Sequence, residues 1–153
     1  HDLFEDIGLK SFVKTSGGKG LHVYVPLSRC KEWQWDEVKE FAKHIAKNMA
    51  SEEPKKYIAT MSKEKRRGKI FVDYLRNSRG ATCASAFSTR AKKGAPVSTP
   101  ISWDELETSL KADQYTVENV IDRLERLKSD PWKDYFKIRQ SITKAMKKKV
   151  GME

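Results

Sequence analysis

The sequence is poor in cysteine, with only Cys30 and Cys83 among its 153 residues. Two thiols are too few for a disulfide framework, and a structural zinc site needs about four ligands. We therefore interpret both cysteines as reduced thiols and expect a cytoplasmic protein.

Long apolar runs are missing as well. No stretch of about 18 apolar residues occurs, and the N-terminal residues contain neither a basic leader segment nor an apolar one. We therefore expect no membrane partner. Hydrophobic residues make up 38% and charged residues 34%, which is typical of a folded globular domain. The length favours one domain that covers residues 1–153.

Acidic residues are scarce in the middle of the chain. Residues 55–93 contain 12 Lys and Arg but only 2 Asp and Glu, whereas basic and acidic residues nearly balance on either side, so the net charge of +10 originates there. A basic block is often only a solvated surface. Here it alternates with strand-like segments, which favours a folded surface that binds a polyanion.

Strand and helix patterns alternate along the chain. Residues 11–15 and 21–26 are predicted strands on either side of a glycine-rich turn, and residues 35–54 have helical apolar spacing. Residues 57–61 and 69–75 are again strand-like and are joined by a cationic loop. We predict an α/β (α+β) fold with a mixed, largely antiparallel sheet and flanking helices.

The last third of the sequence predicts helices. Ser102 with Glu105 forms a capping box, Thr116 can cap residues 117–127, and Asp130-Pro131 precedes a predicted helix over 132–149. An apolar stripe with helical spacing is expected to be buried, and it consists of Val117, Val120, Ile121, Leu124 and Leu127.

The turn "SGGKG" places a hydroxyl, Ser16, and an ammonium, Lys19, beside flexible glycines. It lacks the Walker spacing, but glycines let backbone amides converge on an anion, and His22 on the next strand adds a donor. The alternative is an ordinary hairpin with an exposed lysine.

Asp73 lies in the strand-like segment 69–75, among apolar neighbours. A buried carboxylate needs a cationic partner. Either Arg76 or Arg79 forms a structural ion pair with it, or Asp73 is a ligand of Mg²⁺ or Mn²⁺.

Two further arginines are candidates for phosphate binding, because a guanidinium matches phosphate oxygens. Arg90 follows a short strand-like run, and Arg66 lies in the cationic loop between Lys65 and Arg67. The alternative for each is an ordinary surface arginine.

Three segments carry motifs whose order and spacing are specific: "KTSGGKGLHVYVPL", "RRGKIFVDYLRNSRGATCASAFSTRAKKGAPVSTPISWDEL" and "DPWKDYF". Across nearly the whole chain they resemble the primase-polymerase domain of bacterial DNA ligase D, a member of the archaeo-eukaryotic primase superfamily. The resemblance implies a primase-polymerase-like catalytic core. It also implies that Asp73 is the third carboxylate of a two-metal site and that five residues contact the triphosphate of the incoming nucleotide, namely Ser16, Lys19, His22, Arg66 and Arg90.

The implied function is a nucleotidyltransferase, a DNA polymerase or primase that acts at DNA ends in double-strand break repair by non-homologous end joining. Implied cofactors are Mn²⁺ or Mg²⁺. Implied partners are DNA ends or a primer-template, nucleoside triphosphates with ribonucleotides favoured, fused or separate ligase and nuclease domains, and an end-binding protein.

One part of the family pattern is missing. The aspartate pair that binds both metals should precede "LFEDIGLKSFVKTSGGKG", and neither Asp2 nor Asp6 fits that motif. We therefore expect this chain to be the C-terminal portion of the domain, incomplete at its N-terminus and inactive alone.

Two alternatives remain open. One is a non-catalytic module that binds nucleotides or DNA ends through the same basic surface. The other is a small RNA-binding domain that stacks bases on Tyr24, Phe71 and Tyr74.

Overall fold

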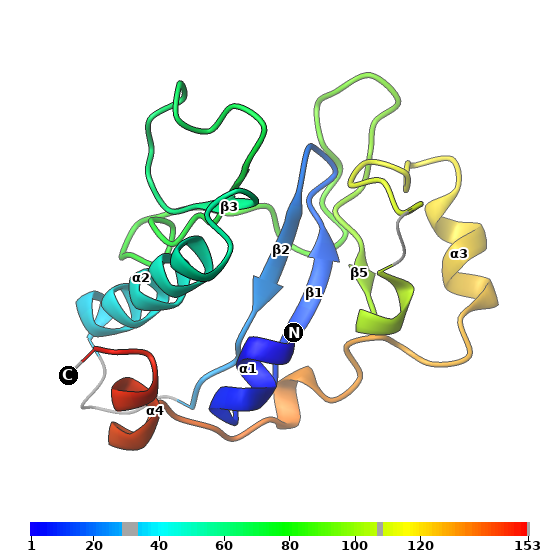
Figure 1. The fold of residues 1–153 in the computed structure, drawn as a ribbon. Coiled ribbons are helices and arrows are strands. Elements are labelled where there is room, and N and C mark those ends of the chain that lie inside the picture. Colours follow the sequence, from blue (N-terminus) through cyan, green and yellow to red (C-terminus); the bar gives the residue numbers. More distant parts are fainter. Residues whose placement is uncertain (29–33, 107–108, 153) are drawn as a thin grey trace. The chain divides into compact units, whose positions relative to one another are not determined.

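The computed structural model describes residues 1–28, 34–106 and 109–152, and it has a mixed α/β architecture (Figure 1). Two compact units share the chain: a sheet unit, formed by His1–Ser28 and Ala84–Ser141, and an α2 unit, formed by Arg29–Cys83 and Ile142–Glu153. The elements of the sheet unit are α1 (Asp2–Ile7), β1 (Phe12–Thr15), β2 (Leu21–Tyr24), β5 (Pro100–Ile101), η1 (Trp103–Glu105), α3 (Val120–Arg126) and η2 (Tyr135–Lys137). Those of the α2 unit are α2 (Trp35–Glu52), β3 (Tyr57–Ile58), β4 (Ile70–Phe71) and α4 (Lys144–Lys149).

The sheet unit is built around three antiparallel strands in the order β2-β1-β5 (Figure 1). Lys14 lies opposite His22, and Phe12 lies opposite Tyr24, so these four side chains share one face of the β1–β2 hairpin. The strands predicted for residues 11–15 and 21–26 are therefore present as β1 and β2, which are one and two residues shorter than predicted.

Aromatic side chains cover part of that face. The rings of Phe12 and Tyr24 pack against Trp132, with centroids 5.9 and 5.1 Å apart, and Trp132 stacks on Tyr135 at 4.9 Å. The indole Nε1 of Trp132 also donates to the carbonyl of Val13 at 2.9 Å. The "DPWKDYF" segment thus packs against the open end of the β1–β2 hairpin, opposite the turn, and stabilises it.

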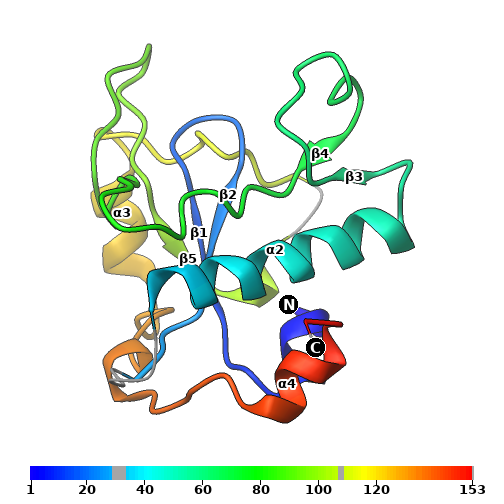
Figure 2. The same cartoon turned by 90° about the vertical axis from the view of Figure 1, so that its left-hand side faces the viewer.

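The α2 unit is organised by its long helix, which buries Phe41, Ile45 and Ala46. Glu37 of α2 pairs with Lys147 of α4, and the Asn48 amide donates to the carbonyl of Val150 at 3.1 Å (Figure 2). The helix predicted from residue 35 is confirmed, although it ends at Glu52 instead of Pro54.

The strands of the α2 unit differ from the prediction. β3 and β4 have two residues each and pair in parallel, Tyr57 with Ile70 and Ile58 with Phe71. The strand-like segments are longer than the strands because the chain becomes irregular after Ile58 and after Phe71, ahead of the turns that begin at residues 63 and 75.

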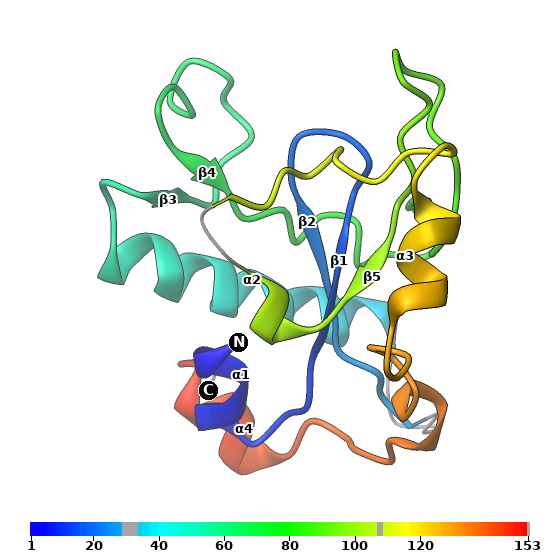
Figure 3. The ribbon, with the colours of Figure 1, turned by 90° about the vertical axis from the view of Figure 1, so that its right-hand side faces the viewer.

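Helix α3, which flanks β5 in the sheet unit, begins at Val120 and not at 117 (Figure 3). The stripe predicted to be core is buried only at Val120, whereas Val117, Ile121 and Leu124 are 49%, 57% and 40% exposed. Helical spacing aligns apolar side chains but does not supply a neighbour to cover them.

The long helix predicted over 132–149 was also wrong. Residues 132–143 form turns and the 3₁₀ helix η2. Gln140 is held by long-range bonds instead of helical ones: its carbonyl accepts from the amide of Ser28 at 2.8 Å, and its side-chain Nε2 donates to the carbonyls of Lys10 and Pro26, both at 2.8 Å. Only the end of the segment is helical, where Thr143 caps α4.

Within the three described ranges, no helix has both the length and the apolarity needed to cross a membrane. Cys83 is an exposed thiol, and Cys30 lies outside the described residues.

Candidate functional site

The glycine turn, residues 16–20, joins β1 to β2 and satisfies much of its own backbone. Ser16 and Gly20 exchange two hydrogen bonds, from the Ser16 amide to the Gly20 carbonyl at 3.0 Å and from the Gly20 amide to the Ser16 hydroxyl at 3.2 Å. The Gly17 amide donates to the carbonyl of Ala112 at 2.9 Å. Three of its amides thus already donate within the protein, two of them inside the turn, so the predicted convergence of backbone donors on an anion is limited and side chains must supply most of the binding.

Arg90 packs directly against this turn. A Cβ placed on Gly17 would lie 2.7 Å from Cγ of Arg90 and 3.3 Å from the carbonyl carbon of Val97. Gly17 also has a φ of +61°, which disfavours any other residue. Arg90, far from the turn in the sequence, therefore packs against the turn that carries Ser16 and Lys19.

Lys92 also reaches the turn, and sequence reasoning missed it. A Cβ on Gly18 would lie 2.9 Å from Nζ of Lys92 and 3.3 Å from Oγ of Ser16. The sequence does contain a signal for it, because Lys92 lies only two residues from Arg90, which is itself a candidate phosphate ligand.

His22 is half-buried in β2, opposite Lys14. Lys14 is fully buried and donates through Nζ to the hydroxyl of Ser98, which donates in turn to the carbonyl of Thr15 at 2.8 Å. Thr15 also accepts from the amide of Thr99 at 3.0 Å. This buried polar layer fixes the end of β1, and with it the turn, to the segment that leads back to Arg90.

Asp73 lies in the α2 unit, and its predicted environment was wrong. β4 ends at Phe71, and the Asp73 side chain is 40% exposed instead of packed among apolar neighbours. Its carboxylate accepts from the Leu75 amide at 3.0 Å and lies 3.9 Å from Nε of Arg76. A short polar side chain that bonds to backbone two residues later favours a turn, which explains why the strand stops.

The metal-binding potential of the described residues is small. Only one group of three or more His, Cys, Asp or Glu ligand atoms lies close enough to share an ion, and it is the exposed set His1, Asp2 and Glu5. Asp73 is not in that group. Its oxygens suit Mg²⁺ or Mn²⁺, but the described residues do not form a complete two-metal site around it.

Arg66 holds its own loop in the α2 unit. Its guanidinium donates to the carbonyls of Thr60 at 3.1 Å and Met61 at 2.7 Å, and it lies 3.6 Å from the centre of the Phe71 ring. Neither neighbouring cation, Lys65 nor Arg67, has such contacts in the structure as described. Arg66 is therefore the distinctive residue of the three, and the role that the structure shows for it is structural.

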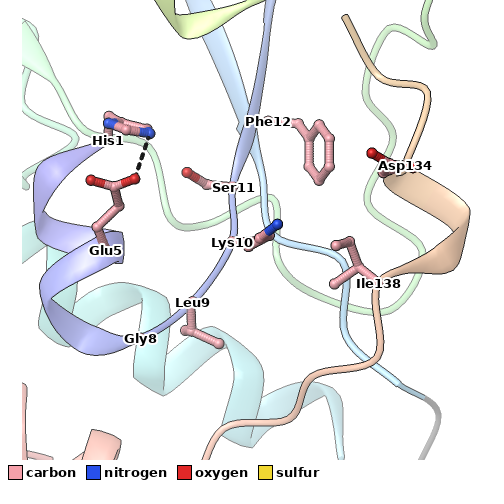
Figure 4. A pocket seen from close by; sticks show the side chains of 9 residues that line it. All are labelled: His1, Glu5, Gly8, Leu9, Lys10, Ser11, Phe12, Asp134 and Ile138. Atoms are coloured by element: carbon pink, nitrogen blue, oxygen red, sulfur yellow. Dashed lines mark ion pairs between the residues drawn. The ribbon is translucent and has the colours of Figure 1, made fainter.

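A cavity of about 450 Å³ opens at the other end of β1 from the turn (Figure 4). Phe12 and Asp134 face it together with the ion pair of His1 and Glu5. None of the predicted site residues lines it. The cavity therefore gives no support to those residues, and the turn remains the candidate site.

Comparison with known proteins gives a consistent set of matches. A family model described as the LigD primase-polymerase domain matches residues 1–132. The multifunctional non-homologous end joining protein LigD of Pseudomonas aeruginosa is 46% identical over 150 residues, covering 97% of this chain and 18% of the relative. The bifunctional non-homologous end joining protein LigD of Bacillus subtilis is 30% identical over 135 residues, covering 88% of this chain and 22% of the relative.

One solved structure is similar in both fold and sequence. It is described as the polymerase domain from Mycobacterium tuberculosis ligase D in complex with DNA. It aligns with a TM-score of 0.77 at 35% identity, covering 86% of this chain and 44% of that chain. The predicted fold class is confirmed by this match, and the chain spans less than half of the solved domain.

Proposed function

Because this chain belongs to the LigD primase-polymerase domain family, we propose that it forms part of a nucleotidyltransferase, of the DNA or RNA polymerase or primase type, that acts at DNA ends in non-homologous end joining. The family model runs through residues of both units. We therefore propose that the two units function as one domain, the C-terminal portion of a LigD polymerase domain.

The observation that carries this proposal is the packing of Arg90 on the glycine turn. It places Arg90 beside the turn that carries the ammonium of Lys19 and the hydroxyl of Ser16. None of the described carboxylates forms an ion pair with Lys19 or Arg90. Such a cationic turn suits a nucleoside triphosphate, with His22 as a further contact. The assignment of Arg66, which lies in the α2 unit, rests on the family resemblance and stays a prediction.

The DNA partner is proposed from charge and from the relatives. Residues 55–93 hold 12 basic and 2 acidic residues, which suits contacts to phosphates. The similar solved domain is described as a complex with DNA. We propose DNA ends or a primer-template as partner in the cytoplasm at the nucleoid, alongside ribonucleotides, linked or separate ligase and nuclease domains and an end-binding protein.

A divalent ion belongs to the same proposal. Asp73 would supply one carboxylate to Mn²⁺ or Mg²⁺, whose chemistry in polymerases is to stabilise the attacking and leaving oxygens of phosphoryl transfer. One carboxylate does not hold two ions, so we assign no catalytic step to the residues of this chain alone.

That shortage of carboxylates favours a second candidate, a module that binds nucleotide and DNA ends without catalysis by itself. Primer extension by the 153-residue chain with Mn²⁺ would exclude this candidate, and the M. tuberculosis polymerase domain is a suitable positive control.

The RNA-binding alternative loses support, because Tyr24 packs against Trp132 and Phe71 packs under Arg66.

Nucleotide titration tests the proposed site. We expect Lys19→Ala to weaken binding of ATP by about 1.5–3 kcal/mol, the range for a hydrogen bond to a charged group. The control is Lys128→Ala, which removes the same charge from another position of the sheet unit. Equal affinities for the wild type and Lys19→Ala would remove Lys19 from the site, and no binding by the wild type would reject the proposed function.

A further inference from the structure

The ammonium group of Lys92 lies over Gly18, and backbone hydrogen bonds fix the loop that carries it. Its amide donates to the carbonyl of Arg90 at 2.8 Å, and its carbonyl accepts from Ala95 at 2.9 Å. A bridge between Thr89 and Val97 closes the base of this loop. The loop that carries Arg90 and Lys92 is therefore fixed by its own backbone, so both side chains reach the turn from a defined position.

Gly17 leaves space for Arg90, and Gly18 leaves space for Lys92. Gly17 needs its positive φ and leaves space for Arg90. Gly18 has no such backbone requirement, and the nearest atom to its missing side chain is Nζ of Lys92. Glycine at position 18 therefore leaves room for the ammonium group of Lys92 directly over the turn.

The charges around the turn are not balanced within the protein. Lys19, Arg90 and Lys92 have no carboxylate partner among the described ion pairs. Positive groups that gather without a counter-charge repel one another, and a bound anion relieves that repulsion. The more negative the anion, the more it gains from the third cation.

Resting on the proposed function, we propose that Lys92 is a specificity-determining residue of the nucleotide site. Its ammonium binds phosphate oxygens over Gly18 and makes the site prefer a nucleoside triphosphate to the diphosphate. Lys19 and Arg90 bind phosphate in either ligand, whereas Lys92 contributes most when the third phosphate is present.

Titration of the 153-residue chain with ATP and with ADP tests this role. Lys92→Gln should weaken ATP binding by about 10-fold, in line with the removal of a charged hydrogen bond, and should weaken ADP binding less. The preference for ATP over ADP therefore falls. Lys93→Gln is the matched control, because Lys93 is the exposed neighbour on the same loop with the same charge, and it should leave both affinities unchanged.

Gly18→Ala provides a second variant that keeps the charge. The added methyl group would lie 2.9 Å from Nζ of Lys92 and displace the flexible ammonium without affecting the positive φ at Gly17. It should lower the ATP preference as Lys92→Gln does, and combining the two substitutions should add little, since both remove the same interaction.

Three results would overturn the inference. Lys92→Gln could bind ATP as the wild type does, it could lose ATP and ADP affinity equally, or Lys93→Gln could show the same loss. In each case a wild type that still binds ATP leaves the proposed function standing. A wild type that binds neither nucleotide overturns both.

Discussion

Among single residues, Gly17 is under the tightest constraint at the turn. Its φ of +61° costs another residue about 1–2 kcal/mol, and a Cβ there would meet both Arg90 and the backbone of Val97. The backbone cannot move aside easily, because the amide of Gly17 is bonded to Ala112.

We therefore expect Gly17→Ala to lower the free energy of unfolding by about 1–3 kcal/mol, from backbone strain and the collision together. Gly18→Ala is the comparison, since it meets only side-chain atoms and should cost less than about 1 kcal/mol. Urea denaturation followed by circular dichroism measures both. A Gly17→Ala protein as stable as Gly18→Ala would show that the turn is looser than its geometry indicates.

At this scale the sequence predicts part of the candidate site. Ser16 and Lys19 were identified because glycines, a hydroxyl and a lysine are adjacent in the sequence. Lys92 and the buried Lys14 were missed because their positions depend on packing between distant segments. Asp73 was placed wrongly because strand periodicity does not reveal that its carboxylate would cap a turn at Leu75.

Among the elements, η1 and α3 are joined through one ion pair. Nη1 of Arg123 lies 2.5 Å from Oε1 of Glu105, and Arg123 also donates to the carbonyl of Pro100 at 3.2 Å. Burial raises the pKa of the Glu105 carboxyl, but hydrogen bonds from Arg123 and Ser102 lower it by more. The net pKa lies below its ordinary value, so this carboxylate stabilises the fold in its charged form.

Glu105→Gln should lower the free energy of unfolding at pH 7 by about 1–3 kcal/mol, because Arg123 loses its counter-charge in a mostly buried position. A depressed folded-state pKa gives stability that is present above the unfolded value, about 4.3, and is lost as the pH falls through the folded value. The difference between wild type and variant should therefore shrink below about pH 4.

Chemical denaturation at several pH values measures this difference, with Glu118→Gln as a control at an exposed position. A difference that stays constant down to about pH 3 would contradict the role of the charge.

Elements whose signals are local were predicted well. The 21–26 strand, the hairpin turn and α2 follow from alternation, glycine and helical spacing. The segment 132–149 failed because Trp132, Tyr135 and Gln140 bond to the hairpin and its flanks in preference to forming helical bonds. Tertiary interactions outweighed local propensity there.

Across the whole molecule, positive charge is concentrated in one stretch of the chain. We expect DNA affinity to fall steeply with salt, with a slope of roughly −0.9 on logarithmic axes for each phosphate bound in duplex DNA. Neutralising three cations of the 59–69 loop, while sparing Arg66, should make the slope shallower by about 1 for each phosphate that the variant no longer binds. The substitutions are Lys63→Gln, Lys65→Gln and Arg67→Gln.

Fluorescence anisotropy with a labelled duplex, measured between about 50 and 200 mM salt, gives the slope. The control carries the same charge change at exposed positions elsewhere, namely Lys149→Gln, Lys133→Gln and Lys148→Gln. An affinity that does not change with salt, or equal effects of the two triple variants, would contradict phosphate binding by this loop.

The order of the chain also affects how the turn is completed during synthesis. The sheet unit begins with His1–Ser28 and resumes only at Ala84, after most of the α2 unit. A nascent chain can therefore form the β1–β2 hairpin before Arg90, Lys92 and β5, which can join it only after the intervening residues of the α2 unit have been synthesised. Until then the edge of β1 that pairs with β5 lacks its partner strand. The three-stranded sheet can therefore be completed only after β5 has been synthesised.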